Sequence, residues 1–430
     1  MSSAEVKRLL LISHHNSYRI APYISAARRL GIEVTIASEG RHSLVTEVVN
    51  GVFVDFNDIQ NASDTLLRQH SSTPFHGVLG SDDVTVELAA SIARRLGLAH
   101  NPPEAARWSY RKDLARARLE LAGCPVPWNR LLDLDRPIDA QTAELRWPCV
   151  LKPLNLSASR GVIRADDRDE FIAAAERIRP ILAHAKGDFE RQHLLVEEYI
   201  DGIEIAFEGF LRQGELCMIT IFDKPDPLTG PYFEETIYVT PTLLDAGMQQ
   251  TVHDTVQQAC KAYGLVTGAV HAECRIDEAG QVWILEIASR TIGGDCGRIL
   301  DSEDFNIEEL AVSLAIDHAI EVNPPGHASG VMMIPIRDAG ILRRVEGLSA
   351  ANRVSNIERV DIIIPEGHEL VPLPEGNRYL GYIFARADSA QEVTQSLREA
   401  HSHLSFVTRP VFRATISGHV DEQNRDRVES

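Results

Sequence analysis

The first hundred residues alternate between short apolar runs and longer amphipathic runs, and this alternation is the strongest constraint on the fold. Each amphipathic run has its apolar residues at helical spacing and is followed at once by a glycine, a common helix stop. Strands that alternate with helices are typical of a parallel sheet with helices on its faces. This region is therefore predicted to be an α/β domain. The predicted strands are Arg8–Ser13, Glu33–Ala37 and Gly77–Gly80, and the predicted helices are Ile20–Leu30 and Val84–Leu96.

Composition narrows the class of protein. With 430 residues, the chain is long enough for several domains. The net charge of −19 argues against a nucleic-acid-binding surface, which needs clustered lysine and arginine, although a few local cations suffice to hold one nucleotide. The six cysteines form no CxxC pair, so neither a zinc site nor a disulfide framework is indicated, and a cytoplasmic location is expected. No apolar run is long enough to span a membrane, and no membrane partner is expected.

Prolines divide the rest of the chain. A long helix is predicted over Pro103–Ala122, before a break at Pro125 and Pro127. Mixed strand and helix signals then continue as far as another break at Pro324 and Pro325. We therefore predict an α/β domain over residues 1–105, an α+β domain with two subdomains over 106–322, a small α+β domain over 323–417, and a disordered tail over 418–430.

The segment that starts at Lys152 carries the strongest chemical signal. A predicted strand ends at Lys152, and a loop of small and polar residues follows, with Ser157, Ser159, Arg160 and Gly161. Small residues let backbone N–H groups approach phosphate oxygens, and the lysine adds positive charge beside them. Neither a P-loop nor a GxGxxG motif is present. Taken alone, the segment fits a phosphate-binding loop and a solvated lysine before an ordinary loop about equally well.

An acidic segment follows, in which an apolar strand runs into Glu197 and Glu198 and a third carboxylate, Glu204, comes shortly afterwards. Adenine offers a donor amine and acceptor nitrogens, so a strand edge with a nearby carboxylate can bind it. A carboxylate such as Glu204 suits the two hydroxyls of ribose. An acidic surface hairpin fits the same residues.

Two predicted strands, joined by a turn at Asp277–Gln281, carry further carboxylates. Period-two alternation puts His271 and Glu273 on one face of the first strand, and Glu286 on the same face as Ile284 in the second. If the register places Glu273 opposite Glu286, two like charges face each other, which destabilises a sheet unless a cation neutralises them. Carboxylate oxygens suit Mg²⁺. A register slip of one residue would put the two carboxylates on opposite faces.

Three further residues have weaker signals. Arg290 leads into glycines that allow close approach to a ligand, and it suits charge on a transferring phosphoryl group, although pairing with a nearby aspartate fits equally. Lys112 lies in a predicted helix and carries little weight by itself. His271 is a candidate proton acceptor, and a supporting role beside Glu273 fits as well.

In their order and spacing, these segments resemble the ATP-grasp superfamily, and within it the carboxylate–amine ligases that include L-amino acid ligases and dipeptide synthetases. The resemblance covers roughly residues 5 to 410, from a Rossmann-like N-terminal domain to a C-terminal domain like that of biotin carboxylase-type members. It implies the ATP-grasp fold, ATP with Mg²⁺ (or Mn²⁺ in its place), small-molecule carboxylate and amine substrates, and a homodimer.

The resemblance also implies a role for each motif residue. The implied contacts are with the phosphates of ATP (Lys112, Lys152 and the loop residues Ser157, Ser159, Arg160 and Gly161), with adenine (Glu197 and the backbone of Glu198, Tyr199 and Ile200), with ribose (Glu204), with the metal (Glu273 and Glu286), and with the phosphoryl group (Arg290, with His271 as a second candidate catalytic residue).

One position departs from the family pattern. Many members place an asparagine two residues after the second metal carboxylate, where this chain has Ala288, so one Mg²⁺ is better supported than two. The implied activity is activation of a carboxylate, expected to belong to an amino acid, as an acyl phosphate that is then coupled to an amine. The alternatives are a carboxylase that uses bicarbonate, a purine-pathway ligase or formyltransferase, and a nucleotide-binding module without catalysis.

Overall fold

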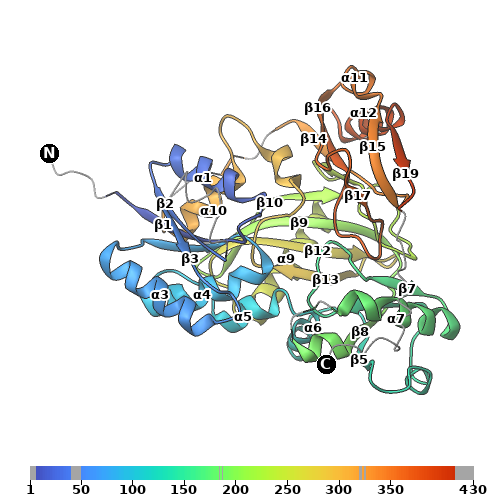
Figure 1. The fold of residues 1–430 in the computed structure, drawn as a ribbon, viewed down its shortest axis with the longest axis horizontal. Coiled ribbons are helices and arrows are strands. Elements are labelled where there is room, and N and C mark those ends of the chain that lie inside the picture. The colour runs from blue at the N-terminus through green and yellow to red at the C-terminus, as the bar shows by residue number, and fades with distance from the viewer. Residues whose placement is uncertain are drawn as a thin grey trace, which may run out of the picture.

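The structure is a computed structural model that describes residues 6–39, 50–183, 185, 187–318, 322–323 and 326–411. The predicted disordered tail, 418–430, lies outside the described residues. Figure 1 shows a large central sheet with an N-terminal lobe, a small green lobe and a C-terminal lobe arranged around it. Among the described residues, no helix has the length and apolar character needed to cross a membrane.

The N-terminal sheet is parallel, as the alternation predicts, with the strand order β3-β2-β1-β4. Leu9 and Leu11 of β1 pack toward α1 and α10 on one face, whereas Leu10 and Ile12 pack toward α3 and α4 on the other. The elements are β1 (Arg8–Ile12), α1 (Ile20–Arg29), β2 (Glu33–Ser38), β3 (Asn50–Phe53), α3 (Ile59–Ser72), β4 (Gly77–Gly80), α4 (Asp83–Leu96) and the distant α10 (Ile307–Ala315).

Helix α10 ties the N-terminal sheet to a segment more than two hundred residues later. A Cβ atom at Gly77 would lie 2.2 Å from the Ala315 carbonyl oxygen, so only glycine permits this close approach of β4 to α10. The N-terminal sheet therefore has a fixed position relative to the rest of the chain.

The long helix predicted over Pro103–Ala122 is interrupted, and that prediction is wrong in this respect. Helices α5 (Pro103–Trp108) and α6 (Lys112–Leu121) are separate. The Ser109 hydroxyl donates to the Ala106 carbonyl at 2.7 Å, and the Lys112 N–H donates to the Leu154 carbonyl at 2.9 Å. These bonds override the helix propensity of the segment and make Lys112 the first residue of α6.

The small lobe contains a four-stranded sheet with the order β5-β8-β6-β7, which is covered by α7. Phe171 and Ile178 of α7 are buried with Leu194 and Val196 of β8. The elements are β5 (Asn129–Asp133), a 3-10 turn (Asp139–Gln141), β6 (Cys149–Pro153), β7 (Ile163–Ala165), α7 (Arg168–Leu182), α8 (Asp188–Gln192) and β8 (His193–Glu198).

The central sheet has eight strands in the order β13-β12-β9-β10-β11-β14-β18-β16, and every neighbouring pair is antiparallel. Its first part comes from β9 (Ile203–Arg212), β10 (Glu215–Asp223), β11 (Ile237–Thr240), β12 (Gly268–Ile276) and β13 (Val282–Ala288). A 3-10 segment (Cys296–Leu300) follows β13.

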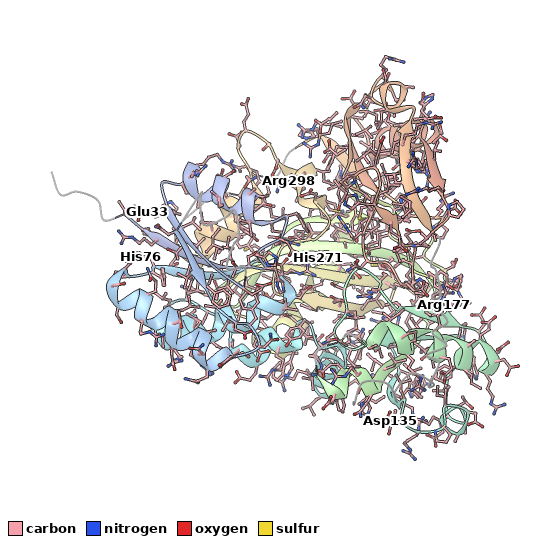
Figure 2. The ribbon with its side chains drawn as sticks, viewed as in Figure 1. Glu33, His76, Asp135, Arg177, His271 and Arg298 are labelled. Atoms are coloured by element: carbon pink, nitrogen blue, oxygen red, sulfur yellow. The ribbon has the colours of Figure 1, made fainter. Side chains whose placement is uncertain are left out.

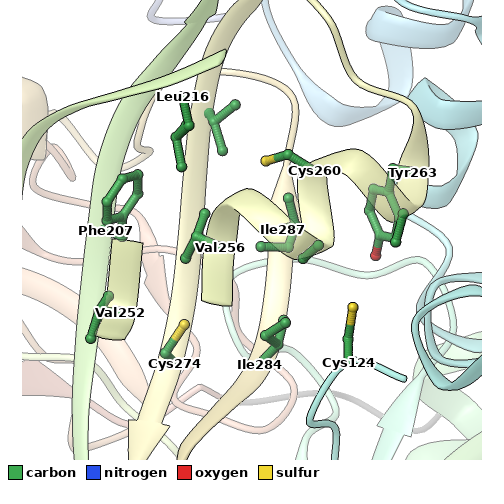
Figure 3. Packing of buried hydrophobic residues seen from close by; sticks show 14 of the residues in the cluster. Cys124, Phe207, Leu216, Val252, Val256, Cys260, Tyr263, Cys274, Ile284 and Ile287 are labelled. Atoms are coloured by element: carbon green, nitrogen blue, oxygen red, sulfur yellow. The ribbon is translucent and has the colours of Figure 1, made fainter. Parts of the chain in front are cut away.

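Helix α9 (Ala246–Tyr263) covers one face of this sheet. Figure 3 shows Val256 and Cys260 of α9 lying over Phe207, Ile284 and Ile287, all of which are buried. Each such side chain contributes roughly 1.5–3 kcal/mol when it is fully buried. Because this face is filled by apolar side chains, the polar residues of β9, β12 and β13 point to the opposite face.

The C-terminal lobe continues the central sheet rather than starting a new one. Strand β14 pairs with β11, so the sheet crosses the predicted boundary between residues 322 and 323. The domain limits themselves stay a prediction. The elements are β14 (Ala328–Ile334), β16 (Ile357–Ile362), β18 (Gly381–Ala387), α11 (Leu348–Ala351), α12 (Ala390–Ser402) and a second sheet, β17-β15-β19, formed by Glu369–Leu370, Gly340–Glu346 and Ser405–Arg409.

Candidate active site

A cavity of about 880 Å³ lies where the central sheet, the small lobe, the N-terminal lobe and the C-terminal lobe meet. Of the residues predicted to form a site, Arg160 and Gly161 do not line it. The predicted residues that do line it are Lys112, Lys152, Ser157, Ser159, Glu197, Glu198, Tyr199, Ile200, Glu204, His271, Glu273, Glu286 and Arg290. Segments far apart in the sequence are therefore brought to one cavity.

The two carboxylates Glu273 and Glu286 are direct partners in the β12–β13 ladder. The register jumps between Cys274–Ile284 and Glu273–Glu286, so that Leu285 is an extra residue in β13. Because of this bulge, Ile284 packs in the apolar core while Leu285 and Glu286 line the cavity. The predicted opposition of the two carboxylates is found, whereas the prediction that Glu286 shares a face with Ile284 is wrong.

A buried lysine that the sequence analysis did not identify lies among the carboxylates of the cavity. The Lys224 Nζ lies 2.8 Å from a Glu204 oxygen and 3.6 Å from a Glu273 oxygen, and it also contacts Glu235. Burial alone would lower the pKa of Lys224, but the three carboxylates hold it well above the usual value. Oxygens of Glu204, Glu235 and Glu273 lie within 4.8 Å of one another, an arrangement that suits a cation.

His271 lies at the centre of the molecule, on the cavity face of β12 (Figure 2). Its Nδ1 is 3.0 Å from a Glu208 oxygen and its Nε2 is 3.8 Å from a Glu273 oxygen. Burial would lower the pKa of His271, but bonds to these two carboxylates raise it to about 9. Because both ring nitrogens already face carboxylates, the geometry favours the supporting role over the catalytic one.

Lys152 is held by a buried ion-pair network. Its Nζ is 2.5 Å from a Glu197 oxygen, and Arg116 of α6 donates to the same carboxylate. Arg116 also donates to the carbonyl of Leu285, the bulge residue of β13. The Glu197 side chain is 1% exposed, so its carboxylate is enclosed by the two cations rather than free to receive adenine. The structure thus pairs Glu197 with Lys152 and Arg116, a contact that the sequence did not indicate.

The hinge after β8 offers backbone groups to the cavity. The N–H groups of Glu198 and Tyr199 donate to the carbonyls of Trp128 and Pro148. Among the described residues, the Ile200 N–H has no partner, which makes it the candidate donor to a base. The Tyr199 ring lies under the guanidinium groups of Arg164, at 4.2 Å, and Arg275, at 4.9 Å.

Lys112 enters the cavity from the first turn of α6. Its Nζ donates to the Leu156 carbonyl at 2.9 Å and lies 3.5 Å from a Glu286 oxygen. Lys112 and Lys152 therefore approach the loop after β6 from two different elements. The separation of α5 from α6 is what places Lys112 at this position.

The loop after Lys152 was expected to contact the phosphates of ATP along its whole length, but only part of it lines the cavity. Ala158 and Ser159 have positive φ angles of 55° and 53° and line the cavity. Arg160 instead donates to the Glu375 carbonyl at 3.0 Å, and the Gly161 N–H donates to the Pro374 carbonyl at 2.9 Å. Arg160 and Gly161 thus attach the loop to the C-terminal lobe.

Arg290 forms a two-bond ion pair with Asp83, the first residue of α4, at 2.6 and 2.7 Å. Burial would raise the pKa of Asp83, but the charge and hydrogen bonds of Arg290, together with the charges of Arg19 and Lys112, lower it below its usual value. The pair links β13 to the N-terminal lobe, and it replaces the pairing with a local aspartate that was considered from the sequence. Asp83 is an acidic residue at the start of a helix, where such residues are common, so the sequence did not indicate its contact with Arg290.

Comparison with known proteins agrees with this geometry. A family model of the ATP-grasp N-terminal domain matches residues 24–100, a model of the ATP-grasp domain matches residues 145–299, and a model of L-amino acid ligase C-terminal domain 2 matches residues 332–409. The crystal structure of an L-amino acid ligase from Bacillus licheniformis is similar, with a TM-score of 0.78 and 25% sequence identity over 94% of this chain and 99% of that chain.

Two curated ligases are also similar. Dapdiamide A synthase of Enterobacter agglomerans is 28% identical over 244 residues, which are 54% of each chain. Alanine–anticapsin ligase of Bacillus subtilis (strain 168) is 27% identical over 237 residues, which are 50% of each chain. The match spans about half the length of these two relatives. With the three matched domains and the shared architecture, the chain belongs to the ATP-grasp superfamily, in its branch of ATP-dependent carboxylate–amine ligases.

Proposed function

We propose that this protein uses ATP and Mg²⁺ to activate the carboxylate of an amino acid as an acyl phosphate, and then couples it to an amine to form an amide or dipeptide. The observation that carries the proposal is the paired Glu273 and Glu286 on the cavity face of the sheet, with Lys112 and Lys152 beside them. The names of the similar ligases, which refer to alanine and to L-amino acids, support an amino acid as the substrate.

The donor atoms of the cavity fit a hard divalent cation. Carboxylate oxygens are the ligands that Mg²⁺ prefers, and Glu273 shares a cluster of such oxygens with Glu204 and Glu235. Glu273 and Glu286 would hold Mg²⁺ here, and the Lys224 ammonium would balance the remaining carboxylates. When bound, the ion would neutralise charge on the triphosphate.

Charge balance is the main task of the remaining side chains. A triphosphate and a carboxylate repel each other, and at ~4 Å and an effective dielectric near ~20 each uncompensated pair of charges costs about 4 kcal/mol. Lys112, Lys152 and Arg290 line the cavity and offset this repulsion. They also hold the reacting oxygens in place, which is most of what an enzyme contributes to phosphoryl transfer.

The second step forms a C–N bond. The amine attacks the acyl carbon, the phosphate departs with the electrons of the C–O bond, and the amine proton leaves on that phosphate. Water must be excluded, because it would hydrolyse the acyl phosphate. The segment after β10 contributes to this: the Pro231 carbonyl accepts from the Arg164 N–H at 2.9 Å, and the Thr229 carbonyl accepts from the Arg164 side chain at 2.7 Å. These bonds attach the segment to the small lobe, and Leu228 and Phe233 of the same segment line the cavity.

Phosphate release against a matrix of paired amino acids tests the proposal. We expect release to require ATP, Mg²⁺ and both partners of a productive pair, and mass spectrometry to find the condensed product. Bicarbonate in place of the amine should not support release. Silence across the whole matrix, or release that depends on bicarbonate alone, would contradict the proposed function.

Asp83→Asn is expected to lower kcat by about tenfold or more while leaving the KM for ATP within about twofold, because the Arg290 guanidinium loses the carboxylate that orients it. The measurement is steady-state phosphate release with the best pair from the matrix. Asp64→Asn, on the exposed side of α3, is the matched control and should behave like wild type. If kcat is unchanged in Asp83→Asn, the reaction does not depend on the orientation of Arg290 by Asp83.

A further inference from the structure

A loop of the C-terminal lobe, residues 371–379, forms part of the cavity wall. It accepts two hydrogen bonds, from Arg160 and Gly161, which belong to the loop after Lys152 that we expect to bind phosphate (the phosphate loop, residues 157–161). In addition, Glu375 makes a two-bond ion pair with Arg177 of α7 at 2.8 and 3.2 Å (Figure 2 labels Arg177). The bend at Gly376 needs glycine, because a Cβ there would lie 2.0 Å from the Val371 carbonyl oxygen. The loop is therefore fixed against the small lobe.

Arg378 is the charged residue that this loop presents to the cavity, together with Asn377 and Tyr379. Within the described part of the chain, no carboxylate pairs with Arg378, and it makes no hydrogen bond. Every other cationic lysine or arginine in the described cavity lining has an acidic partner: Arg19 with Asp82, Lys112 with Glu286, Lys152 with Glu197, Arg275 with Glu204, and Arg290 with Asp83.

The residues around Arg378 come from the loop after Lys152 and from the C-terminal lobe. Tyr382, Tyr18 and Gly294 line the same cavity as Arg378. Arg378 also shares a small hollow with Ala158 of the phosphate loop. Arg378 thus lies beside the loop that follows Lys152 and lines the same cavity as Tyr18 and Tyr382.

We propose that Arg378 binds the free carboxylate of the amine-donating substrate, and so selects amino acids over simple amines as acceptors. The inference rests on the proposed function and specifies the acceptor class. The cavity lining carries more carboxylates than cations, so an incoming carboxylate is repelled unless an uncommitted cation receives it. A guanidinium suits this task because its fork of N–H groups can form two parallel bonds to one carboxylate.

The test compares acceptors with and without a carboxylate. The variants are Arg378→Met and Arg378→Lys. The acceptors are the standard L-amino acids and their carboxamides, each supplied with ATP, Mg²⁺ and the carboxylate substrate identified in the matrix of paired amino acids. For Arg378→Met we expect kcat/KM for amino acid acceptors to fall by about tenfold or more, mainly through KM, and kcat/KM for carboxamides to stay within about twofold. Arg378→Lys should keep part of the preference. Arg343→Met, an exposed arginine of β15, is the matched control.

A second measurement follows only the first step of the proposed reaction, the formation of the acyl phosphate. Hydroxylamine traps the acyl phosphate as a hydroxamate without any amino acid acceptor, and Arg378→Met should form it at the wild-type rate with an unchanged KM for ATP. Loss of hydroxamate formation would show that Arg378 serves the phosphates, and an equal loss for amino acids and carboxamides would show a merely structural role. Either result overturns the inference while leaving the ligase function intact. If wild type forms neither hydroxamate nor amide, the proposed function itself fails and the inference fails with it.

Discussion

Glu286→Ala and Lys152→Ala are each expected to abolish ATP turnover while the protein stays folded. Glu286 faces the cavity opposite Glu273, and its loss removes half of the expected metal site. Lys152 carries the positive charge at the start of the loop that we expect to bind phosphate, and in its absence Glu197 still has Arg116 as a buried partner. We expect phosphate release to fall at least about a hundredfold in each variant. Circular dichroism and a thermal unfolding curve check that the fold is kept.

Two exposed residues provide matched controls for these variants. Glu278 lies in the turn between β12 and β13, the same two strands that carry the paired carboxylates, and Lys261 is an exposed lysine near the end of α9. Glu278→Ala and Lys261→Ala should therefore retain wild-type turnover. Near-normal turnover in Glu286→Ala or Lys152→Ala would refute the assignment of the site.

Arg116→Met is expected to destabilise the protein by about 3–5 kcal/mol, because it leaves the Glu197 carboxylate buried with only Lys152 beside it. Burial would raise the pKa of Glu197, but Arg116 and Lys152 together lower it to about 2. A carboxyl group with a lowered pKa stabilises the fold at pH values above its unfolded pKa, near 4.5, and loses that contribution as the pH falls toward 2. The urea midpoint at pH 7 measures the effect.

The double variant Arg116→Met/Glu197→Gln separates the ion pair from packing. Removing the buried charge together with its partner should recover part of the lost stability, since the penalty comes from the unpaired carboxylate. In addition, the wild-type urea midpoint should fall between pH 5 and pH 3 more steeply than that of the double variant. Equal destabilisation of the single and double variants would assign the effect to the lost packing of Arg116 alone.

Local sequence patterns were sufficient to predict most of the strands that build the site. The alternation over Gly268–Ile276 puts His271 and Glu273 on the cavity face and Val270 and Ala272 in the core, as found. The strands predicted before Lys152, before Glu197 and on either side of the turn at Asp277–Gln281 correspond to β6, β8, β12 and β13. These elements are predictable because one face of each is buried, and burial imposes a period of two on the sequence.

Contacts between distant segments were not predictable in the same way. No local pattern marks the extra residue Leu285, yet this bulge is what turns Glu286 away from the core and toward the cavity. Asp83 and Arg378 reach the site from other lobes, at sequence separations that periodicity does not address. Lys224 did leave a signal, since it directly follows the apolar strand β10, but its three carboxylate partners come from separate segments.

The continuity of the central sheet has a practical consequence for exchanging parts of this enzyme with its relatives. The prolines near residue 322 suggest a junction, but a crossover placed there would divide the central sheet between two parents. Strand β14 pairs with β11 (Ile237–Thr240) on one side and with β18 on the other. In the recombined protein, β11 and β14 would come from different parents and would still have to pair with each other. Exchange of the loop that carries Arg378, between β17 and β18, would leave this ladder whole and would transfer a smaller part of the chain.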